Sequence, residues 1–297
     1  MRIEVLSIFP QMFSEVMSTS IIGRAREAGI LEFVAHDLRN WTHDLHRTTD
    51  DECYGGGAGQ LMKVEPVFEA LDELLGCAAD VGSAPASALV SVPAPTPTSA
   101  PASAPASAPA PTPASALASA PAPASAPAAN PAKVVFFTPA GQRLDQRLVE
   151  QLAAEPRLLL VCGRYEGFDE RVYSRADLCV SIGDYILTGG ELAAMVLADA
   201  ICRLLPGALG DATSPLEESF SASQGGLLEY PQYTRPAEYR GLAVPEVLLG
   251  GNHRLIAEWR REQAIIKTAQ LRPDLLSSAD LSASDREVLQ RHWEADS

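Results

Sequence analysis

The sequence lacks the motifs that mark the commonest nucleotide and metal sites. No G-x-x-x-x-G-K-[ST] segment occurs, and no G-x-G-x-x-G segment opens a helix after the first expected strand. These absences exclude a P-loop and a Rossmann dinucleotide site. The cysteines are odd in number and have neither a C-x-x-C spacing nor a partnering His cluster; they are Cys53, Cys77, Cys162, Cys179 and Cys202. A disulfide framework and a zinc site are therefore also excluded.

Long apolar runs are missing as well. The longest, Leu192–Leu205, is interrupted by Asp199 and Arg203 and is too short to span a bilayer. The N-terminal apolar stretch contains Glu4 and has no small-residue cleavage site, which favours a strand over a signal peptide. We therefore expect a cytoplasmic protein with reduced cysteines and no membrane association.

Positive charge is scarce: 23 Lys and Arg residues stand against 38 Asp and Glu residues, for a net charge of −15. Over the whole chain this balance argues against a partner as acidic as a nucleic acid. The charge is unevenly distributed, however. Residues 231–272 carry seven positive and four negative side chains, whereas residues 273–297 carry two positive and six negative ones. Because phosphate contacts need only a local basic patch, RNA is not excluded.

Charged and aromatic residues are absent from Val81 to Ala132. Residues 83–132 are almost pure Ala, Pro, Ser and Thr and hold 13 of the 23 prolines. Such a segment cannot bury enough apolar area to offset the entropy of ordering, and frequent proline forbids a regular helix or a central strand. We predict a disordered, polyproline-biased insertion that is inert for folding and activity; a docking or tethering role is the alternative.

Short apolar runs alternate with helical patterns in the rest of the chain. Strands are predicted at Val5–Phe9, Leu31–Ala35, Val134–Thr138, Leu158–Cys162 and Leu178–Ile182, and helices at Thr19–Ala28, Val64–Leu75, Leu144–Leu152 and Glu191–Leu205. Strands without polar alternation are covered on both faces, so we expect an α/β domain with a parallel sheet and ligands at the carboxyl ends of the strands. After a polar hinge, the apolar spacing from Leu255 to Ile266 predicts a helical C-terminal part.

Three glycine-rich segments lie between these elements. Gly163–Arg171 follows the fourth strand, Ser181–Leu192 follows the fifth, and Tyr54–Gly59 follows three acidic residues. A glycine after a buried strand lets a ligand approach the backbone, and the second segment combines free backbone groups with an apolar wall that suits a flat, uncharged ring. Each segment also has a plainer interpretation: a tight turn, a solvated loop with local ion pairs around Arg164, or a flexible surface loop.

Together with Thr138–Gly141, these segments closely resemble the bacterial tRNA (guanine-N1)-methyltransferases of the TrmD type, which belong to the SPOUT class of S-adenosylmethionine enzymes. The resemblance extends from residue 1 to about residue 275 apart from the insertion, and it includes Ser7–Pro10, Gly23–Ala25, His46–Thr48 and Gly225–Pro236. It implies an α/β fold whose C-terminal part threads a deep trefoil knot, contrary to the general rule that chains do not knot.

The resemblance also implies a division into domains. Residues 1–82 and 133–209 are expected to form the knotted domain that binds S-adenosylmethionine, with 83–132 as its insertion. Residues 210–226 would form an interdomain linker, and residues 227–297 a small helical domain that binds tRNA.

A binding site for S-adenosyl-L-methionine follows from the same resemblance. The positions that carry over are Phe136, Phe137, Thr138, Pro139, Gly163, Tyr165, Glu166, Gly167, Ser181, Ile182, Gly183, Tyr185, Leu187, Gly189 and Gly190. The family is an obligate homodimer with its active site at the subunit interface. It also depends on Mg²⁺, for which oxygen ligands are too generic to assign from a sequence.

The implied target is the guanosine immediately 3′ of the anticodon, in tRNAs where another guanosine precedes it. Methylation of N1 requires a base for the N1 proton and a cationic partner for the charge that builds on O6. The family's linker Asp falls on Glu218 here, one methylene longer, and its Arg falls on Arg203. Without the resemblance, Arg203 is a salt-bridge partner of Asp199 on its own helix and Glu218 a solvated linker charge.

Further positions carry over as contacts to the RNA substrate: His46, Arg47, Asp50, Tyr54, Gly55, Gly59 and Asp184. For His36 and His43 we expect exposed or locally bonded side chains. Two other functions stay open. One is a SPOUT methyltransferase acting on ribosomal RNA; the other is a catalytically impaired RNA-binding SPOUT protein, motivated by Glu218 and by the long insertion.

Overall fold

A computed structural model describes residues 1–76, 131–211 and 218–295. The chain divides into two compact units, one made of Met1–Ala70 with Asn130–Ser297 and the other of Leu71–Ala129. The insertion predicted at 83–132 lies outside the described residues except for its last two, so its predicted disorder is not tested. The same holds for residues 212–217 of the predicted linker.

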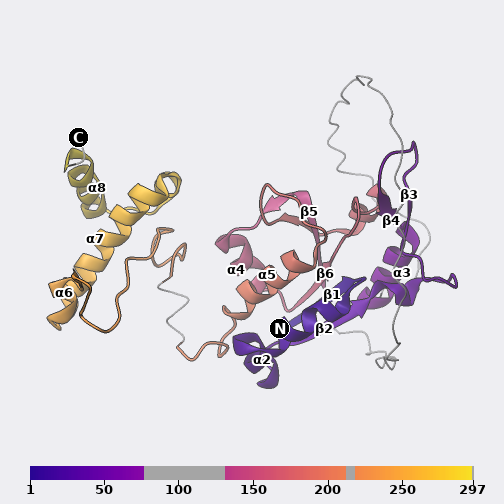
Figure 1. Cartoon of the computed structure of the whole chain (residues 1–297), viewed down its shortest axis with the longest axis horizontal. Helices are drawn as coiled ribbons and strands as arrows, with labels where there is room; N and C mark the ends of the chain where they lie inside the picture. Colours follow the sequence, from indigo (N-terminus) through magenta and orange to yellow (C-terminus); the bar gives the residue numbers. More distant parts are fainter. Residues whose placement is uncertain (77–130, 212–217, 296–297) are drawn as a thin grey trace. The chain divides into compact units, whose positions relative to one another are not determined.

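Five parallel strands form the central sheet, in the order β2-β1-β6-β5-β7 (Figure 1). They are β1 (Arg2–Ser7), β2 (Glu32–Asp37), β5 (Lys133–Arg143), β6 (Arg157–Val161) and β7 (Leu178–Ser181). The expected α/β class with a parallel sheet is confirmed. The first strand ends at Ser7 and not at Phe9, because Pro10 opens a 3-10 helix, η1 (Pro10–Phe13).

The helices between and after these strands are α1 (Ser14–Ser18), α2 (Ser20–Glu27), α3 (Val64–Leu75), α4 (Gln146–Ala153) and α5 (Glu191–Cys202). Asp145 sets the start of α4, because its carboxylate accepts a hydrogen bond from the Leu148 backbone N–H at 2.8 Å. The helix therefore begins two residues after the predicted Leu144. Helix α5 ends at Cys202, three residues before the predicted end, and Pro206 and Gly207 follow its last turns.

Both faces of the sheet are covered, which explains the lack of polar alternation in its strands. On one face, Ile3, Val135 and Leu160 belong to a single buried cluster with apolar residues of α2, α4 and α5. On the other face, the ring of Phe136 packs against Phe168 at 5.3 Å and Tyr173 at 5.7 Å between centroids. Tyr173 belongs to a 3-10 helix, η3 (Glu170–Arg175).

The backbone crosses itself closely at two glycines near the carboxyl edge of the sheet. Phe137 and Gln142 of β5 both pair with Val180 of β7, so residues 138–141 loop out between them. A Cβ at Gly141 would lie 2.5 Å from the Val180 nitrogen, and one at Gly190 would lie 2.9 Å from the Cys162 Cα. Only glycine leaves room for these two crossings.

A short antiparallel hairpin, β3 (Asp50–Glu52) with β4 (Gln60–Met62), carries the glycine-rich segment Tyr54–Gly59. The sequence did not predict these strands, because acidic residues are depleted in strands. They are held from outside the hairpin: the Met62 N–H donates to the Gly167 carbonyl at 2.9 Å, and the Glu166 N–H to that of Gln60 at 3.0 Å.

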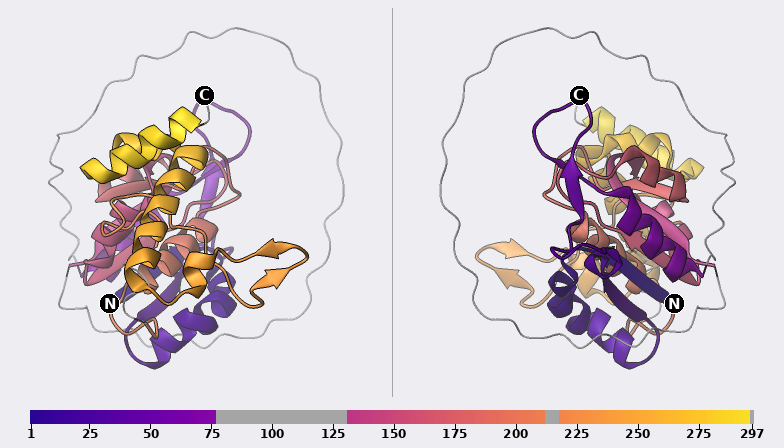
Figure 2. Two further views of the ribbon diagram at one scale, coloured as in Figure 1. Left: turned by 90° about the vertical axis from the view of Figure 1, so that its left-hand side faces the viewer. Right: turned by 90° about the vertical axis from the view of Figure 1, so that its right-hand side faces the viewer.

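The C-terminal segment is helical, with α6 (Glu246–Leu249), α7 (His253–Leu271), the 3-10 helix η5 (Pro273–Ser277) and α8 (Ala283–Ala295). Leu227, Ile265 and Leu289 form its small buried core. Two short strands, β8 (Glu238–Tyr239) and β9 (Leu242–Ala243), form a hairpin that extends away from the helices in Figure 2. Among the described residues, no helix is long and apolar enough to cross a membrane.

Candidate active site

Three loops meet at the carboxyl edge of the sheet. One is the bulge of residues 138–141 within β5, and the other two follow β6 at Gly163 and β7 at Ile182. These three strands are neighbours in the order β6-β5-β7. Because parallel strands end at the same edge, segments far apart in sequence come together there. Two of the loops are joined directly, since the Gly190 N–H donates to the Gly163 carbonyl at 2.9 Å and Arg164 forms a backbone bridge with Gly189.

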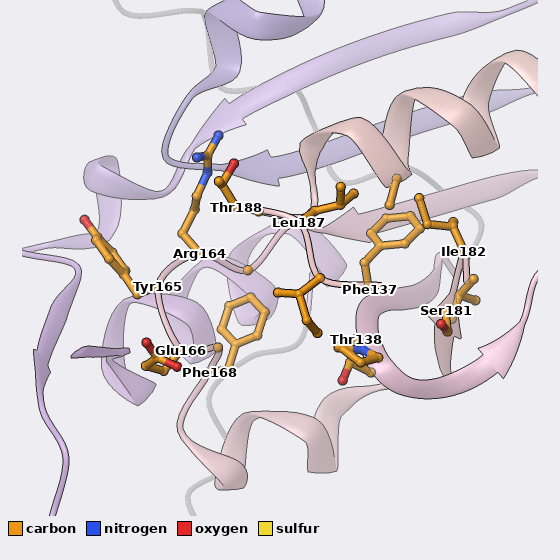
Figure 3. Close-up of a pocket in the computed structure, with 18 of the residues that line it drawn as sticks. Phe137, Thr138, Arg164, Tyr165, Glu166, Phe168, Ser181, Ile182, Leu187 and Thr188 are labelled. Atoms are coloured by element: carbon orange, nitrogen blue, oxygen red, sulfur yellow. The ribbon is translucent and has the colours of Figure 1, made fainter. Parts of the chain in front are cut away.

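A cavity of about 340 Å³ lies between these loops, within the usual range for small-molecule sites (Figure 3). All but one of the positions predicted to bind S-adenosylmethionine line it: Phe137, Thr138, Pro139, Gly163, Tyr165, Glu166, Gly167, Ser181, Ile182, Gly183, Tyr185, Leu187, Gly189 and Gly190. The wall combines apolar side chains with glycine backbone, so it suits a ligand that is largely flat and apolar with a few polar groups.

Phe136 and Asp184 do not line the cavity, although both were predicted as site residues and their chain neighbours line it. Phe136 is fully buried behind the wall, against Phe168 and Tyr173. The wall also contains residues that were not singled out from the sequence: Arg164, Phe168, Tyr173, Val180, Ile186, Thr188 and Ala193. Spacing gives no signal for Phe168 and Tyr173, since they reach the wall only by packing on the buried Phe136.

Arg164 does not belong to a solvated loop with local ion pairs. Its Nε donates to the Glu191 carboxylate at 3.0 Å, 27 residues along the chain. The local interpretation does hold for Arg171, whose exposed guanidinium pairs with Asp169 two residues away.

The hairpin β3–β4 brings the glycine-rich segment Tyr54–Gly59 beside the segment Gly163–Arg171. A Cβ at Gly59 would lie 2.4 Å from the Glu166 Cγ, so the two segments are in contact. Tyr54 is fully exposed at the other end of the segment, where Gly55 and its neighbours adopt positive φ. The hairpin thus places Gly59 at the cavity and leaves Tyr54 free to meet a larger partner.

Tyr165 turns out of the cavity loop, and Figure 3 shows its ring directed away from the cavity centre. Its backbone has φ +59°, a strained value for a bulky residue. Partial burial raises the pKa of the Tyr165 hydroxyl, and the charge of Asp50, which hydrogen bonds with it, raises it further. Asp50 is therefore held beside the cavity loop, as the prediction of a substrate contact requires.

His46 and Arg47 lie in a turn organised by Asp44. The Asp44 carboxylate accepts hydrogen bonds from the Thr48 hydroxyl at 2.7 Å and from the His46 and Thr48 backbone N–H groups. These bonds, led by that from the Thr48 side chain, lower the pKa of Asp44. Both predicted RNA contacts are exposed.

Arg203 and Glu218 form a bidentate ion pair. The Arg203 Nη1 and Nη2 donate to the two carboxylate oxygens at 2.6 and 2.5 Å, and these bonds raise the pKa of the guanidinium. Both alternatives drawn from the sequence are therefore wrong, because Arg203 pairs with Glu218 and Glu218 is not an isolated solvated charge. The resemblance assigned these two residues to one reaction, and the structure places them in contact.

Of the two histidines that were expected to be exposed or locally bonded, only His43 agrees with the structure. His43 is exposed and pairs with Glu69. The His36 Nε2 lies 3.1 Å from a carboxylate oxygen of Glu4, 32 residues away, and both are largely buried. The prediction is wrong for His36, since only the pairing of β1 with β2 brings the two residues together.

A parallel α/β fold with a glycine-walled cavity at the carboxyl edge of its sheet is typical of proteins that bind small molecules at that edge. The sequence profile of the family described as tRNA (Guanine-1)-methyltransferase TrmD matches residues 1–88 and 114–278. The chain belongs to this family.

Curated relatives agree over almost their whole length. The chain is 43% identical over 291 residues to the tRNA (guanine-N(1)-)-methyltransferase of Geotalea uraniireducens (strain Rf4), covering 98% of this chain and 96% of the relative. It is 44% identical to that of Symbiobacterium thermophilum, covering 98% and 97%. It is 41% identical to that of Geobacillus kaustophilus (strain HTA426), covering 99% and 98%.

Proposed function

We propose that the protein transfers a methyl group from S-adenosylmethionine to N1 of the guanosine immediately 3′ of the anticodon, in tRNAs where another guanosine precedes it. The observation that carries this proposal is the cavity at the ends of β5, β6 and β7, in a chain of the tRNA (guanine-1)-methyltransferase family. Methyl transfer to tRNA is the activity in the names of the relatives.

The cavity suits S-adenosylmethionine on two grounds. Gly183, Gly189 and Gly190 offer backbone at positions where a Cβ would lie within 3 Å of neighbouring atoms, so the wall is shaped by main chain. Leu187 and Phe137 supply apolar surface for the adenine ring, and Glu166 supplies charge for the amino group of the methionine moiety. When bound, the sulfonium provides the methyl group.

Arg203 and Glu218 are the proposed catalytic residues. Glu218 accepts the N1 proton of guanine, and Arg203 donates hydrogen bonds to O6 as negative charge builds there. One bond forms between N1 and the methyl carbon while the bond between sulfur and that carbon breaks, in line. In the structure Arg203 donates two hydrogen bonds to Glu218, at 2.6 and 2.5 Å. When guanine binds, its edge therefore replaces Glu218 as the hydrogen-bond partner of Arg203.

The tRNA is proposed to contact His46, Arg47 and the loop around Tyr54, all of which are exposed. The basic side chains of residues 231–272 supply phosphate contacts. Among these, Arg254 and Arg260 lie on α7. The cytoplasmic location predicted from the sequence fits a tRNA substrate and stays a prediction.

A homodimer is supported by an exposed apolar surface. Met12 and Val16 lie one helical turn apart, as do Leu192 and Val196 on α5, and each is between about a third and a half exposed. Helix α5 contacts η1, the element that carries Met12. Apolar surface of this kind fits a second copy of the chain.

We also propose a SPOUT-type trefoil knot, on the basis of family membership. The close backbone crossings at Gly141 and Gly190 support this proposal.

Mg²⁺ dependence also stays a proposal, without a site. Among the residues that the structure describes, no group of three His, Cys, Asp or Glu side chains is arranged to hold a metal ion. The assay below therefore includes Mg²⁺ and compares it with a chelator.

The test is methyl transfer to a tRNA transcript that carries the guanosine doublet, with the modified position located by a primer-extension stop. A transcript whose preceding guanosine is replaced by adenosine tests the sequence requirement. Glu218→Gln is expected to lower kcat by about a hundredfold or more, the scale of a lost general base. Arg203→Ala is expected to cost a similar factor, the scale of one lost oxyanion donor.

Asp199→Asn is the matched control, because Asp199 lies in the last turn of α5, four residues before Arg203 at the end of that helix, and has no role in the proposed reaction. Its kcat should stay within about twofold of the parent. Full activity of Glu218→Gln would refute its assignment as the base. Failure of the parent to methylate with Mg²⁺ present would overturn the enzymatic function and favour the RNA-binding alternative. Methylation of ribosomal RNA alone would favour a SPOUT methyltransferase that acts on ribosomal RNA.

A further inference from the structure

A buried carboxylate, that of Glu191, lies directly behind the cavity wall and belongs to none of the roles assigned above. Glu191 is in the first turn of α5 and is only 1% exposed. One carboxylate oxygen accepts from the Ser7 hydroxyl at 2.7 Å, and the other from the Arg164 Nε at 3.0 Å. A buried charge is costly unless it is paired, so both bonds are needed to keep it there.

Arg164 connects this carboxylate to the cavity. Its side chain is mostly buried, lies over the ring of Phe9 at 4.6 Å from the centroid, and lines the cavity. Its backbone carbonyl accepts from the Gly167 N–H at 3.0 Å, which closes the loop 163–167 that forms one wall. The position of the guanidinium thus sets where that loop begins.

The other wall, residues 183–190, is in direct contact with this pair. Gly189 forms a backbone bridge with Arg164. A Cβ on Gly189 would lie 2.4 Å from the Arg164 Nε and 2.5 Å from a Glu191 carboxylate oxygen. The ion pair is therefore packed against the Gly189 backbone, and the spacing of the two walls depends on it.

We propose that Glu191 is a positioning residue for the ligand cavity and acts through Arg164. It does not touch the ligand; it holds Arg164 so that the loops 163–167 and 183–190 keep the spacing that binds S-adenosylmethionine. This inference rests on the proposed function of the cavity. Loss of the carboxylate charge is expected to weaken binding of the ligand and to leave the methyl-transfer step unchanged once the cavity is saturated.

The experiment uses the full chain and S-adenosylhomocysteine as the probe, with its Kd measured by isothermal titration calorimetry. Glu191→Gln keeps the shape and removes the charge. Its Kd is expected to rise by roughly tenfold, equivalent to about 1.4 kcal/mol. In steady-state methylation of the tRNA transcript, KM for S-adenosylmethionine should rise by the same factor, while kcat and KM for tRNA stay within about twofold.

Two further variants separate positioning from a general loss of structure. Arg164→Met should raise Kd like Glu191→Gln, and the double variant should be no weaker than the weaker single one, because both remove the same interaction. Arg171→Met removes an exposed ion pair near the same loop and should leave Kd unchanged. If Glu191→Gln does not fold, Arg164→Met alone carries the test with the same expected Kd.

A fall in kcat at unchanged Kd, or additive effects in the double variant, would overturn the proposal. So would an unchanged Kd in Glu191→Gln or, should that variant not fold, in Arg164→Met. If the parent protein binds no S-adenosylhomocysteine, the proposed function of the cavity fails instead, so the two failures are distinguishable.

Discussion

Replacing Glu4 with Gln should destabilise the protein at neutral pH and have little effect in acid. Glu4 lies in the middle of β1 and is 1% exposed. Its carboxylate accepts hydrogen bonds from Arg157 at 2.6 Å and Arg2 at 3.0 Å, and lies 3.1 Å from the His36 Nε2. Arg157 is also buried, so loss of the carboxylate removes a buried ion pair from the fold.

The magnitude follows from the pKa of Glu4. Burial alone raises it, but hydrogen bonds from His36, Arg2 and Arg157 outweigh burial and lower it from 4.5 to about 2. A carboxyl group with a lowered pKa in the folded state stabilises the protein above its unfolded pKa, and this contribution is lost as pH falls through the folded pKa. A difference of about 2.5 pH units corresponds to about 3 kcal/mol at pH 7, lost between pH 4.5 and about 2.

The assay is urea unfolding of the parent and Glu4→Gln at a series of pH values from 7 to 2.5. The free energy of unfolding should differ by about 3 kcal/mol at pH 7, and this difference should shrink below pH 4.5. Glu32→Gln is the control, because Glu32 is an exposed partner of Arg2 and should cost less than about 1 kcal/mol. A difference that stays constant with pH, or an equal loss in Glu32→Gln, would refute the reasoning.

Three other outcomes are expected. Gly190→Ala should weaken binding of S-adenosylhomocysteine by tenfold or more in calorimetry, because the new Cβ would lie 2.9 Å from the Cys162 Cα. Gly210→Ala is the control, since there is open space around Gly210 and binding should not change. Equal affinities of the two variants would contradict the close crossing at Gly190. Deleting residues 83–132 should leave the methylation activity unchanged, and light scattering should still give the mass of two shortened chains. A shortened chain that no longer folds would show that the insertion is not inert. Arg254→Gln, on an exposed part of α7, should reduce the slope of log K for tRNA against log salt by about one, and an unchanged slope would remove Arg254 from the phosphate contacts.

Much of the fold could be predicted from local patterns. Each of the five predicted strands overlaps a strand of the sheet, and the helix Val64–Leu75 has the predicted bounds. Local patterns failed where a segment is stabilised from outside itself. The strand Asp50–Glu52 is acidic and unsuited to a sheet on its own, and it forms because β4 is bonded to the loop that contains Gly167.

The candidate site likewise has parts that local patterns predicted and parts that depend on tertiary contacts. Glycine-rich segments after buried strands marked the loops of the cavity, because glycine at such positions has a steric reason that is visible in the sequence. Arg164 and Glu191 carried no such signal: a charged residue in a loop is usually solvated, and nothing local indicates that this pair is buried. Similarly, the helical spacing of Asp199 and Arg203 favoured a pair that the structure replaces with Arg203 and Glu218.

The sequence by itself determined the class of fold, the edge of the sheet that carries the cavity and the family to which the chain belongs, since all three depend on residue types in order along the chain. Only the tertiary structure decided which charged groups meet: Glu4 with Arg157 and His36, Glu191 with Arg164, and Glu218 with Arg203. The physical reason is that the pairing of charges depends on distance in space and on burial. Both are set by the order of the strands in the sheet and by the packing of the loops at its edge.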